Sequence, residues 1–178
     1  MYKGQKVSLE SLERKHLSKC VEWLNDPEVV ETLSMSEPVS MESEQRWYDS
    51  HLKDEHSKIL AVETVEGEYI GNIGLHNIDL HNRKAELGIF IGEKKYWGKG
   101  YGTEAVLLGL KLAFEALNLN RVYLRTFINN KRAQKCYEKA GFKKEGVLRQ
   151  DMFKNGDYVD CVIYSVLVEE YFQSMSTD

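Results

Sequence analysis

The sequence predicts a single α/β domain with a mixed, mostly antiparallel central sheet of about six or seven strands, flanked by about four helices. The apolar residues change from a helical to an alternating period at residue 59 and return to a helical period at residue 103. Short turns separate the alternating runs, which is typical of antiparallel neighbours. A length of 178 residues with 42% hydrophobic residues suits one domain with a sizeable core. We place this domain at residues 7–168, with terminal extensions at 1–6 and 169–178.

The first part of the chain is expected to hold one short strand and two helices. The strand lies near residues 7–9 and precedes a helical pattern over 12–24. Asn25-Asp26-Pro27 ends that pattern, because a residue before proline avoids helical geometry. The second helix begins at Ser40, whose hydroxyl can cap its first turn, and runs toward Leu52.

Three strands are predicted next, over residues 59–64, 69–80 and 86–91. The turns between them contain Glu66-Gly67-Glu68 and His81-Asn82-Arg83. Connections this short join antiparallel neighbours, so we expect an antiparallel meander.

The last part of the chain alternates helices and strands. A helix begins near Thr103, and a strand over 122–127 follows it. The apolar stripe of this helix consists of Val106, Leu107, Leu110, Ala113, Phe114 and Leu117. A short helix then ends at Gly141, and strands over 144–148 and 158–167 are joined across Asn155-Gly156.

Composition argues against several classes of protein. The formal net charge of −4 and the pI near 5.8 do not suit a general nucleic-acid-binding protein, which would normally present a basic face. No stretch approaches the length of a membrane span and the N-terminus lacks the apolar core of a signal peptide, so we expect a cytoplasmic protein without a membrane partner. Cys20, Cys136 and Cys161 lie far apart without metal-ligand spacing, so we expect reduced thiols and no metal.

The segment Trp97-Gly98-Lys99-Gly100-Tyr101-Gly102-Thr103 is the most informative motif. Its three alternating glycines lead from a strand into a helix, so the backbone can approach a ligand and the first helical amides can bind anionic oxygens. The spacing fits neither a Walker loop nor a dinucleotide fingerprint, which needs a ribose-binding acid about 20 residues later. A pyrophosphate cradle and an ordinary glycine-rich turn both stay open.

A second motif extends from Asn130 to Phe142. Asn130 and Tyr137 lie seven residues apart, which is two helical turns and therefore one helix face. Asn130 can cap the helix or bind a ligand amide, and the Tyr137 hydroxyl can donate a hydrogen bond into a cleft. Both residues also have ordinary structural interpretations, as a helix cap and as a core aromatic residue.

Together the two motifs resemble the GCN5-related N-acetyltransferase family, and the resemblance covers most of the chain. Residues 97–102 resemble the family's Gln/Arg-x-x-Gly-x-Gly/Ala loop, and residues 130–142 resemble its Asn-x-x-Ala-x-x-x-Tyr-Glu-Lys-x-Gly-Phe segment. Residues 23–27, 145–149 and 158–160 are similar to the branch that contains ribosomal-protein N-terminal acetyltransferases and spermidine acetyltransferases. Trp97 departs from the usual Gln or Arg at the loop entrance.

The resemblance implies the GNAT fold and direct transfer of an acetyl group from acetyl-CoA to a primary amine, without a metal or a covalent intermediate. It implies that main-chain groups of Ile89 and Ile91 hold the pantetheine arm and that residues 97–103 wrap the pyrophosphate. Tyr137 would face the thioester sulfur as the proton donor. The full set of implied coenzyme A contacts is Ile89, Phe90, Ile91, Trp97, Gly98, Lys99, Gly100, Tyr101, Gly102, Thr103, Asn130, Ala133 and Tyr137.

The reaction needs a free amine, a stabilised oxyanion and a proton for the leaving thiolate. Deprotonating an alkylammonium with a pKa near ~10.4 at neutral pH costs about 4.6 kcal/mol, so we expect a base. Glu86 is the first choice, acting through water, and His76 is the second because histidine titrates near neutrality. The position five residues before Asn130, which supplies the base in some relatives, holds Arg125 and is excluded. An amide of residues 87–91 would meet the oxyanion, with a bulge at Gly88 that splays the sheet.

The acceptor stays open between a protein N-terminus and a polyamine or another small amine. Residues 28–55 contain eight acidic and only two basic residues. Because relatives build part of their acceptor site from this region, the stretch either attracts a cationic acceptor or forms a solvated helix face. A non-catalytic acyl-CoA-binding module is the alternative to an enzyme, and exposed strand edges are compatible with a homodimer.

Overall fold

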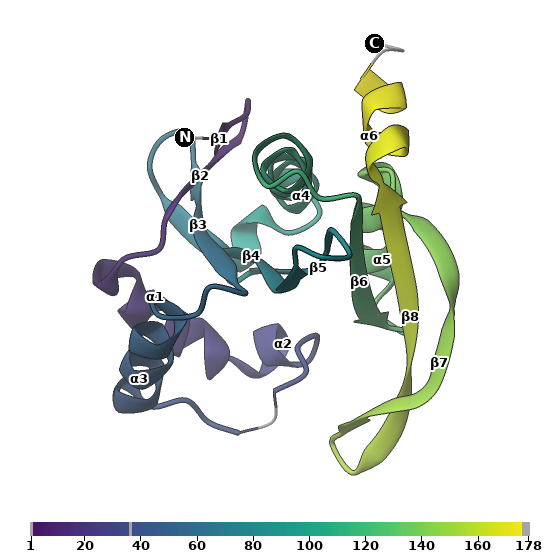
Figure 1. Cartoon of the computed structure of the whole chain (residues 1–178). Coiled ribbons are helices and arrows are strands. Elements are labelled where there is room, and N and C mark those ends of the chain that lie inside the picture. Colours follow the sequence, from purple (N-terminus) through teal and green to yellow (C-terminus); the bar gives the residue numbers. More distant parts are fainter. Residues whose placement is uncertain (1, 36, 176–178) are drawn as a thin grey trace.

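The computed structural model describes residues 2–35 and 37–175, and its centre is an eight-stranded sheet with strand order β1-β2-β3-β4-β5-β6-β8-β7 (Figure 1). The strands are β1 (Tyr2–Lys3), β2 (Val7–Ser11), β3 (Lys58–Thr64), β4 (Tyr69–Asp79), β5 (Lys84–Ile91), β6 (Arg121–Phe127), β7 (Lys143–Lys154) and β8 (Asp157–Leu167). Neighbouring strands are antiparallel except β5 and β6, which are parallel. The predicted fold class, a mixed and mostly antiparallel α/β sheet, is confirmed.

Six α-helices flank the sheet in the described part of the chain, rather than the four predicted. They are α1 (Leu17–Leu24), α2 (Pro27–Val30), α3 (Met41–His51), α4 (Tyr101–Lys111), α5 (Lys131–Lys139) and α6 (Val168–Met175). α1 ends at Leu24, directly before Asn25-Asp26-Pro27 as predicted. Pro27 then occupies the first position of the unpredicted helix α2, where its missing amide costs nothing, and Asp26 caps that helix. β1 is a two-residue strand, too short to show a period in the sequence.

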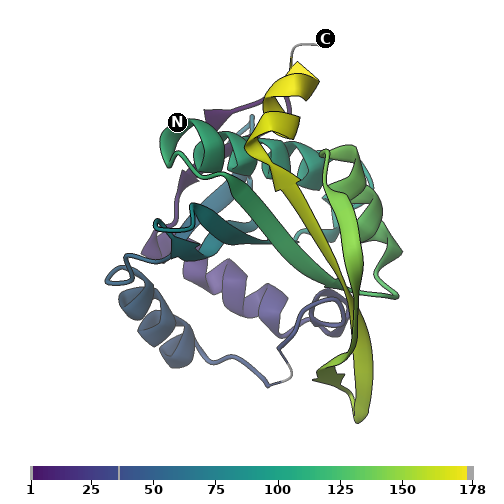
Figure 2. The same ribbon diagram turned by 45° about the vertical axis from the view of Figure 1, so that its right-hand side comes forward.

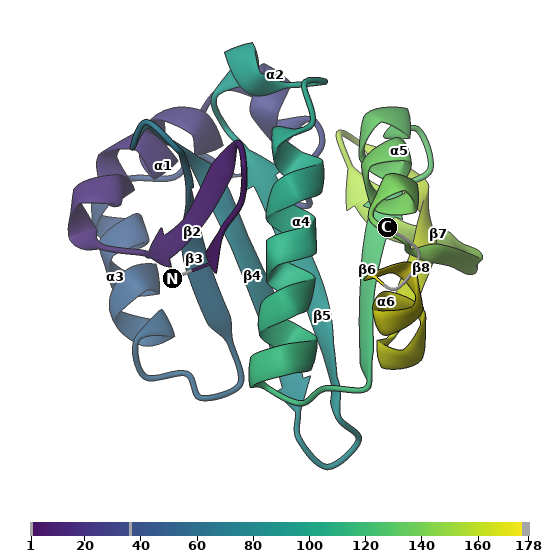
Figure 3. The ribbon, with the colours of Figure 1, turned by 90° about the horizontal axis from the view of Figure 1, so that it is seen from above.

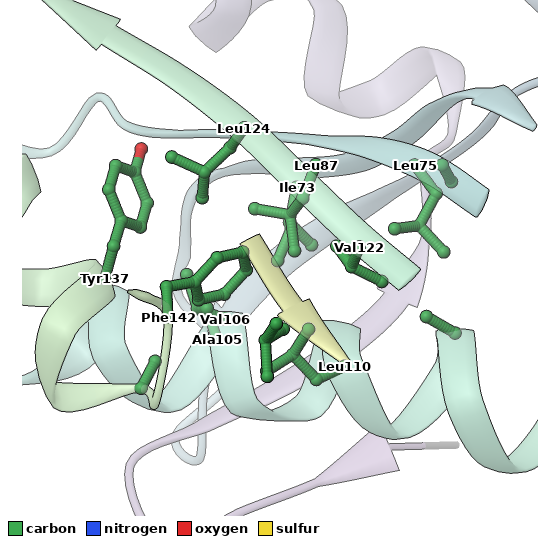
Figure 4. Packing of buried hydrophobic residues seen from close by; sticks show 14 of the residues in the cluster. Ile73, Leu75, Leu87, Ala105, Val106, Leu110, Val122, Leu124, Tyr137 and Phe142 are labelled. Atoms are coloured by element: carbon green, nitrogen blue, oxygen red, sulfur yellow. The ribbon is translucent and has the colours of Figure 1, made fainter. Parts of the chain in front are cut away.

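Alternate residues of β3 divide between two hydrophobic clusters on opposite faces of the sheet. Leu60 and Val62 pack in the cluster that includes α4, whereas Ile59 and Ala61 pack with residues of α1 and α3. Figure 3 shows α4 lying over one face of the sheet, along β4 and β5, with α5 and α6 beside it near β6 and β8. Figure 4 shows the larger cluster, in which Ala105, Val106 and Leu110 of α4 meet side chains of β4, β5 and β6.

The sheet opens between β5 and β6, and this opening positions the functional site. Residues 84–86 of β5 pair with residues 121–123 of β6, and beyond these pairs the two strands separate. The expected bulge at Gly88 is wrong, because β4 and β5 stay in register from Ile91 to Glu86. The irregularity lies between His76 and Asp79 of β4, where Asn77 has a φ of 51°.

Gly88 has a different structural purpose from a bulge. It lies opposite Gly74 on β4, and the imidazole of His76 packs against both glycines. A Cβ at position 74 would lie 2.6 Å from the His76 Nε2 atom, so only glycine leaves room for the ring there.

Candidate active site

A cavity of about 900 Å³ lies where β5 and β6 separate. Its walls come from the α2–α3 region, β4, β5, β6, the glycine loop, α5 and β7. Most of the residues predicted as site residues line it, namely His76, Glu86, Ile89, Phe90, Ile91, Trp97, Gly98, Gly100, Gly102, Thr103, Asn130, Ala133 and Tyr137. Lys99 and Tyr101 do not; the Lys99 carbonyl accepts a hydrogen bond from Lys6, and the Tyr101 ring packs on Tyr96.

The glycine loop presents backbone amides at the start of α4. Gly98 and Gly100 have φ angles of 71° and 89°, a region that favours glycine. Gly100 is the N-cap of α4, and the first intrahelical bond runs from the Glu104 amide to the Gly100 carbonyl. The amides of residues 101–103 therefore have no partner within the helix and can bind anionic oxygens.

Glu104 and Lys6 fix this loop to the N-terminal segment, a feature that the sequence analysis missed. The Glu104 carboxylate accepts hydrogen bonds from the amides of Gln5, Lys6 and Val7 at 2.7–3.0 Å. The Lys6 ammonium donates to the Lys99 carbonyl at 2.7 Å. An acid in the first turn of a helix was the available signal, but nothing in the sequence indicates that it binds residues nearly a hundred positions earlier.

Trp97 replaces the usual polar residue at the loop entrance and has two contacts. Its indole Nε1 donates to the Ile91 carbonyl at 2.6 Å, and the Arg132 guanidinium lies 3.7 Å from the ring centroid. Arg132 of α5 therefore places a cation beside the loop, where Trp97 itself carries none.

The Trp97 contact also shows which edge of β5 is free. Because the Ile91 carbonyl accepts from Trp97, the main-chain groups of Ile91 face away from β4. Backbone groups of alternate residues on a strand face the same edge, so those of Leu87 and Ile89 also face the opening. Phe90 faces the other way, with its main chain toward Asn72 of β4 and its ring against Trp23.

Asn130 caps α5 and still has a donor to offer. Its side-chain oxygen accepts from the Ala133 amide at 3.1 Å, and its NH₂ group has no hydrogen-bond partner among residues 2–35 and 37–175. Gln134, which the sequence analysis did not single out, donates to the carbonyls of Phe127 and Ile128 and so fixes α5 against the end of β6. The Thr103 hydroxyl donates to the Cys136 thiol at 3.4 Å.

Tyr137 is 7% exposed and projects from α5 at the cavity wall. Its ring packs against Phe142, while its hydroxyl points away from that residue and hydrogen-bonds to none of the described residues (Figure 4). Burial raises the pKa of Tyr137 above its ordinary value, so the phenol is protonated at neutral pH. A neutral buried hydroxyl without a protein partner can donate to a ligand atom.

Glu86 and His76 are register partners on β5 and β4. The Glu86 carboxylate accepts from the Arg125 guanidinium and from the Asn77 side chain, both at 3.1 Å. Arg125 also binds Asp151 of β7 at 3.3 Å. Burial lowers the pKa of His76, and Glu86 opposes this effect only in part, so the imidazole is uncharged at neutral pH.

Lys154 connects the end of β7 to the segment that includes the end of α2 and the residues after it. Its ammonium donates to the carbonyls of Val30, Leu33 and Met35, and the residue is only 8% exposed. Figure 2 shows the tip of the β7–β8 hairpin beside α2, where this contact lies. Residues 32–35 line the cavity, so Lys154 holds part of its wall in place.

Comparison with known proteins identifies this arrangement. Residues 6–143 match the model of an acetyltransferase (GNAT) domain. The chain belongs to the GNAT family. The glycine loop, the free edge of β5 and the α5 tyrosine are thus parts of an acetyl-CoA-dependent N-acetyltransferase, which transfers an acetyl group to a primary amine.

This acetyltransferase is similar along its whole length to enzymes named for a polyamine. It is 32% identical to the spermidine N(1)-acetyltransferase of Escherichia coli (strain K12), over 99% of this chain and 94% of that protein. It also superposes on the spermidine N-acetyltransferase of Vibrio cholerae in complex with CoA and spermine, with a TM-score of 0.89, 28% identity, and coverage of 95% of this chain and 99% of that one. The putative ribosomal N-acetyltransferase YdaF of Bacillus subtilis is 41% identical, but over only 60% of this chain and 57% of that protein.

No three His, Cys, Asp or Glu side chains among the described residues are grouped to hold a metal ion. No helix in residues 2–35 or 37–175 is both long and apolar enough to cross a bilayer.

Proposed function

We propose that this GNAT enzyme acetylates a polyamine or a related small diamine. The full-length similarity to spermidine N-acetyltransferases carries the proposal. Acidic residues that line the cavity from elements other than α5 support it. Glu86 and Asp151 outnumber Arg125 there, and Arg125 is already bound by both carboxylates. A cationic acceptor is favoured in such surroundings.

A protein N-terminus is the second candidate acceptor. The 41% identity to the putative ribosomal N-acetyltransferase YdaF supports it, over 106 residues. The similarity to spermidine N-acetyltransferases extends over the whole chain, so we place the polyamine first.

The proposed binding roles follow from the free backbone groups. The amides of residues 101–103 and the Arg132 guanidinium would hold the pyrophosphate, and the Asn130 NH₂ group would bind the pantetheine arm. The main-chain groups of Ile89 would pair with the same arm, because they face the opening of the sheet. We assign the catalytic domain to residues 7–168, to which β1 adds an edge strand and α6 adds a helix whose Tyr171 packs into the core.

The proposed chemistry needs two proton transfers. Acetyl-CoA supplies the acetyl group as a thioester. Glu86 accepts the proton of the attacking amine through water, with its carboxylate fixed by Arg125 and Asn77. Tyr137 donates its phenolic proton to the leaving sulfur. The Leu87 or Ile89 amide, which faces the opening, hydrogen-bonds the oxygen on which negative charge develops.

We also propose a cytoplasmic location and a homodimer. The three cysteines are free thiols, which suits a reducing compartment. β7 is an edge strand of the sheet and offers unpaired backbone groups to a second copy. Light scattering on the purified protein measures the oligomeric state directly.

The deciding experiment measures free thiol released from acetyl-CoA with spermidine, spermine, aminoglycosides and peptides that begin with Ser or Ala. Release with the polyamines and not with the peptides is the expected result. Release with the peptides alone would overturn the polyamine assignment in favour of a protein N-terminus. A thermal shift with coenzyme A but no release with any acceptor would favour the non-catalytic binding module.

A further inference from the structure

Glu44 is a buried carboxylate at the wall of the active-site cavity. It lies on α3, is only 5% exposed, and lines the cavity together with Ser43 and Trp47 of the same helix. Within residues 2–35 and 37–175 it forms no ion pair, whereas Glu86 and Asp151 share Arg125. A carboxylate is rarely buried without a cation, because losing water costs the charged form several kcal/mol.

The protein groups around Glu44 are neutral. The Cys20 thiol interacts with its carboxylate. Cys20 in turn lies 2.9 Å from the Tyr69 hydroxyl, which donates to the Asn72 side chain at 2.7 Å. This network of three uncharged side chains holds the position of Glu44 without supplying a positive charge. Burial raises the pKa of Glu44, so a cation in the cavity is needed to stabilise the charged carboxylate. The open side of Glu44 is the cavity, so a bound ligand can supply the missing positive charge.

The other charges around the cavity divide it into two halves. Arg132, Lys135 and Lys139 line it from α5, beside the glycine loop, where a polyphosphate would lie. Glu44, Glu86 and Asp151 line it from α3, β5 and β7, with Arg125 as the opposing cation. Glu44 is the member of the acidic half that no protein cation in the described residues engages.

We propose that Glu44 binds the second, non-reacting ammonium of the acceptor and thereby makes the enzyme select diamines over monoamines. The attacking amine must be uncharged at the moment of reaction, while the distal amine keeps its proton and its charge. Glu44 of α3 lines the same cavity as the β4–β5 pair that carries His76 and Glu86, so one acceptor can contact both. This inference rests on the proposed function and adds the residue that recognises the substrate class.

The test compares two acceptors of equal length, 1,5-diaminopentane and 5-amino-1-pentanol, in which a hydroxyl replaces one ammonium. We expect the wild type to prefer the diamine by roughly tenfold or more in kcat/KM. Glu44→Gln should lower kcat/KM for the diamine by roughly 10- to 100-fold, through KM, and leave the amino alcohol within about twofold. Glu42→Gln, an exposed acid on the same helix, is the matched control and should keep the wild-type preference.

The outcomes separate the inference from the proposed function. If the wild type acetylates the diamine and Glu44→Gln keeps the same preference, or loses activity equally with both acceptors, the Glu44 assignment is overturned and the polyamine function stands. If the wild type acetylates peptides but no diamine, the proposed acceptor fails and the Glu44 inference fails with it. Thermal unfolding checks that Glu44→Gln folds, which we expect because the substitution removes a buried charge.

Discussion

Tyr137 and Asn130 each present a hydrogen-bond donor to the cavity from one helix. Both donors lack partners among the described residues, although the rest of each side chain is packed or bonded. An unused donor at the wall of a cavity is what a ligand site requires, since a buried polar group is otherwise almost always satisfied.

Replacing Tyr137 with Phe tests the proposed proton donor. We expect kcat to fall by roughly 10²-fold or more, because the leaving thiolate loses its proton source. The affinity for coenzyme A should stay within about threefold and the folded state should keep its stability, because the hydroxyl bonds to no described residue and its loss leaves no partner unsatisfied. Steady-state rates and a coenzyme A titration measure these quantities. A variant as fast as the wild type would remove Tyr137 from the mechanism.

Glu86 and His76 are distinguished by a pair of substitutions. We expect Glu86→Gln to lower kcat by roughly 10²-fold, because the group that accepts the amine proton is lost. His76→Asn should cost less than about fivefold, because the imidazole is packed against Gly74 and Gly88 and has less access to water. Since the pKa of His76 is lowered, a His76-dependent loss of rate would appear only below pH 6.5. The reverse pattern, with an acid limb that disappears in His76→Asn, would assign the base to His76.

Among the elements, the β7–β8 hairpin contributes Asp151, Met152 and Cys161 to the lining of the cavity. β7 runs to Lys154, six residues beyond the strand end at 148 that the sequence predicts. It therefore carries Asp151 and Met152 to the cavity and Lys154 to the segment that follows α2. The Lys154 ammonium thus connects the hairpin to residues 30–35, which lie more than a hundred positions earlier in the chain.

Lys154→Met tests this connection between elements. The substitution removes hydrogen bonds to three carbonyls, so we expect the free energy of unfolding to fall by about 2 kcal/mol. The acceptor KM should rise several-fold because residues 32–35 lose their anchor, while coenzyme A affinity should change little. Lys144→Met, at an exposed position of the same strand, is the control for both measurements. Equal acceptor KM values for the two variants would contradict the proposed anchoring of the wall.

At the scale of the whole molecule, stability in acid depends on ion pairs that cross the sheet. Arg121 of β6 binds Glu145 of β7 through two hydrogen bonds of 2.6 and 2.7 Å, and Ser165 of the intervening β8 donates to the same carboxylate. These contacts, the guanidinium above all, lower the pKa of Glu145 from 4.5 to about 2. The folded state thus binds a proton at Glu145 less readily than the unfolded chain does.

The resulting stability should depend on pH in a defined window. The Glu145 contribution is fully present above pH 4.5 and is lost as the pH falls from 4.5 toward 2, because the unfolded chain takes up the proton first. Chemical denaturation at several pH values should show a smaller loss of stability between pH 4.5 and 2 in Glu145→Gln than in the wild type. Glu169→Gln, at an exposed position of α6, should keep the wild-type dependence. Parallel curves for wild type and Glu145→Gln would contradict this assignment.

Much of the architecture was predictable from local patterns, and the parts that were not depend on distant contacts. Ser40 capping α3 and the turns between β3, β4 and β5 follow from local chemistry, and the structure has them close to the predicted positions. The short α2 has a local signal in Asp26-Pro27, but at four residues it is too short to show a helical period. The full length of β7 and the start of α6 were not predicted, because the sequence does not mark where β7 and β8 end. In the site, the glycine loop and α5 stand out as motifs, whereas Glu44, Lys154 and Glu104 depend on tertiary partners that spacing does not reveal.

The single parallel pair between β5 and β6 has a consequence for how the protein folds. The pairs β1–β2, β3–β4, β4–β5 and β7–β8 are joined by short turns, so these hairpins can form from contacts that are nearby in sequence. The β2–β3 pairing is more distant, since Ser11 pairs with Leu60. The parallel pairing of β5 with β6 has only three residue pairs, and the chain passes through α4 between these two strands. Loop closure of that length is slow relative to hairpin formation. The cavity exists only after β5 and β6 have paired, so we expect coenzyme A binding to recover later during refolding than the local hairpins do.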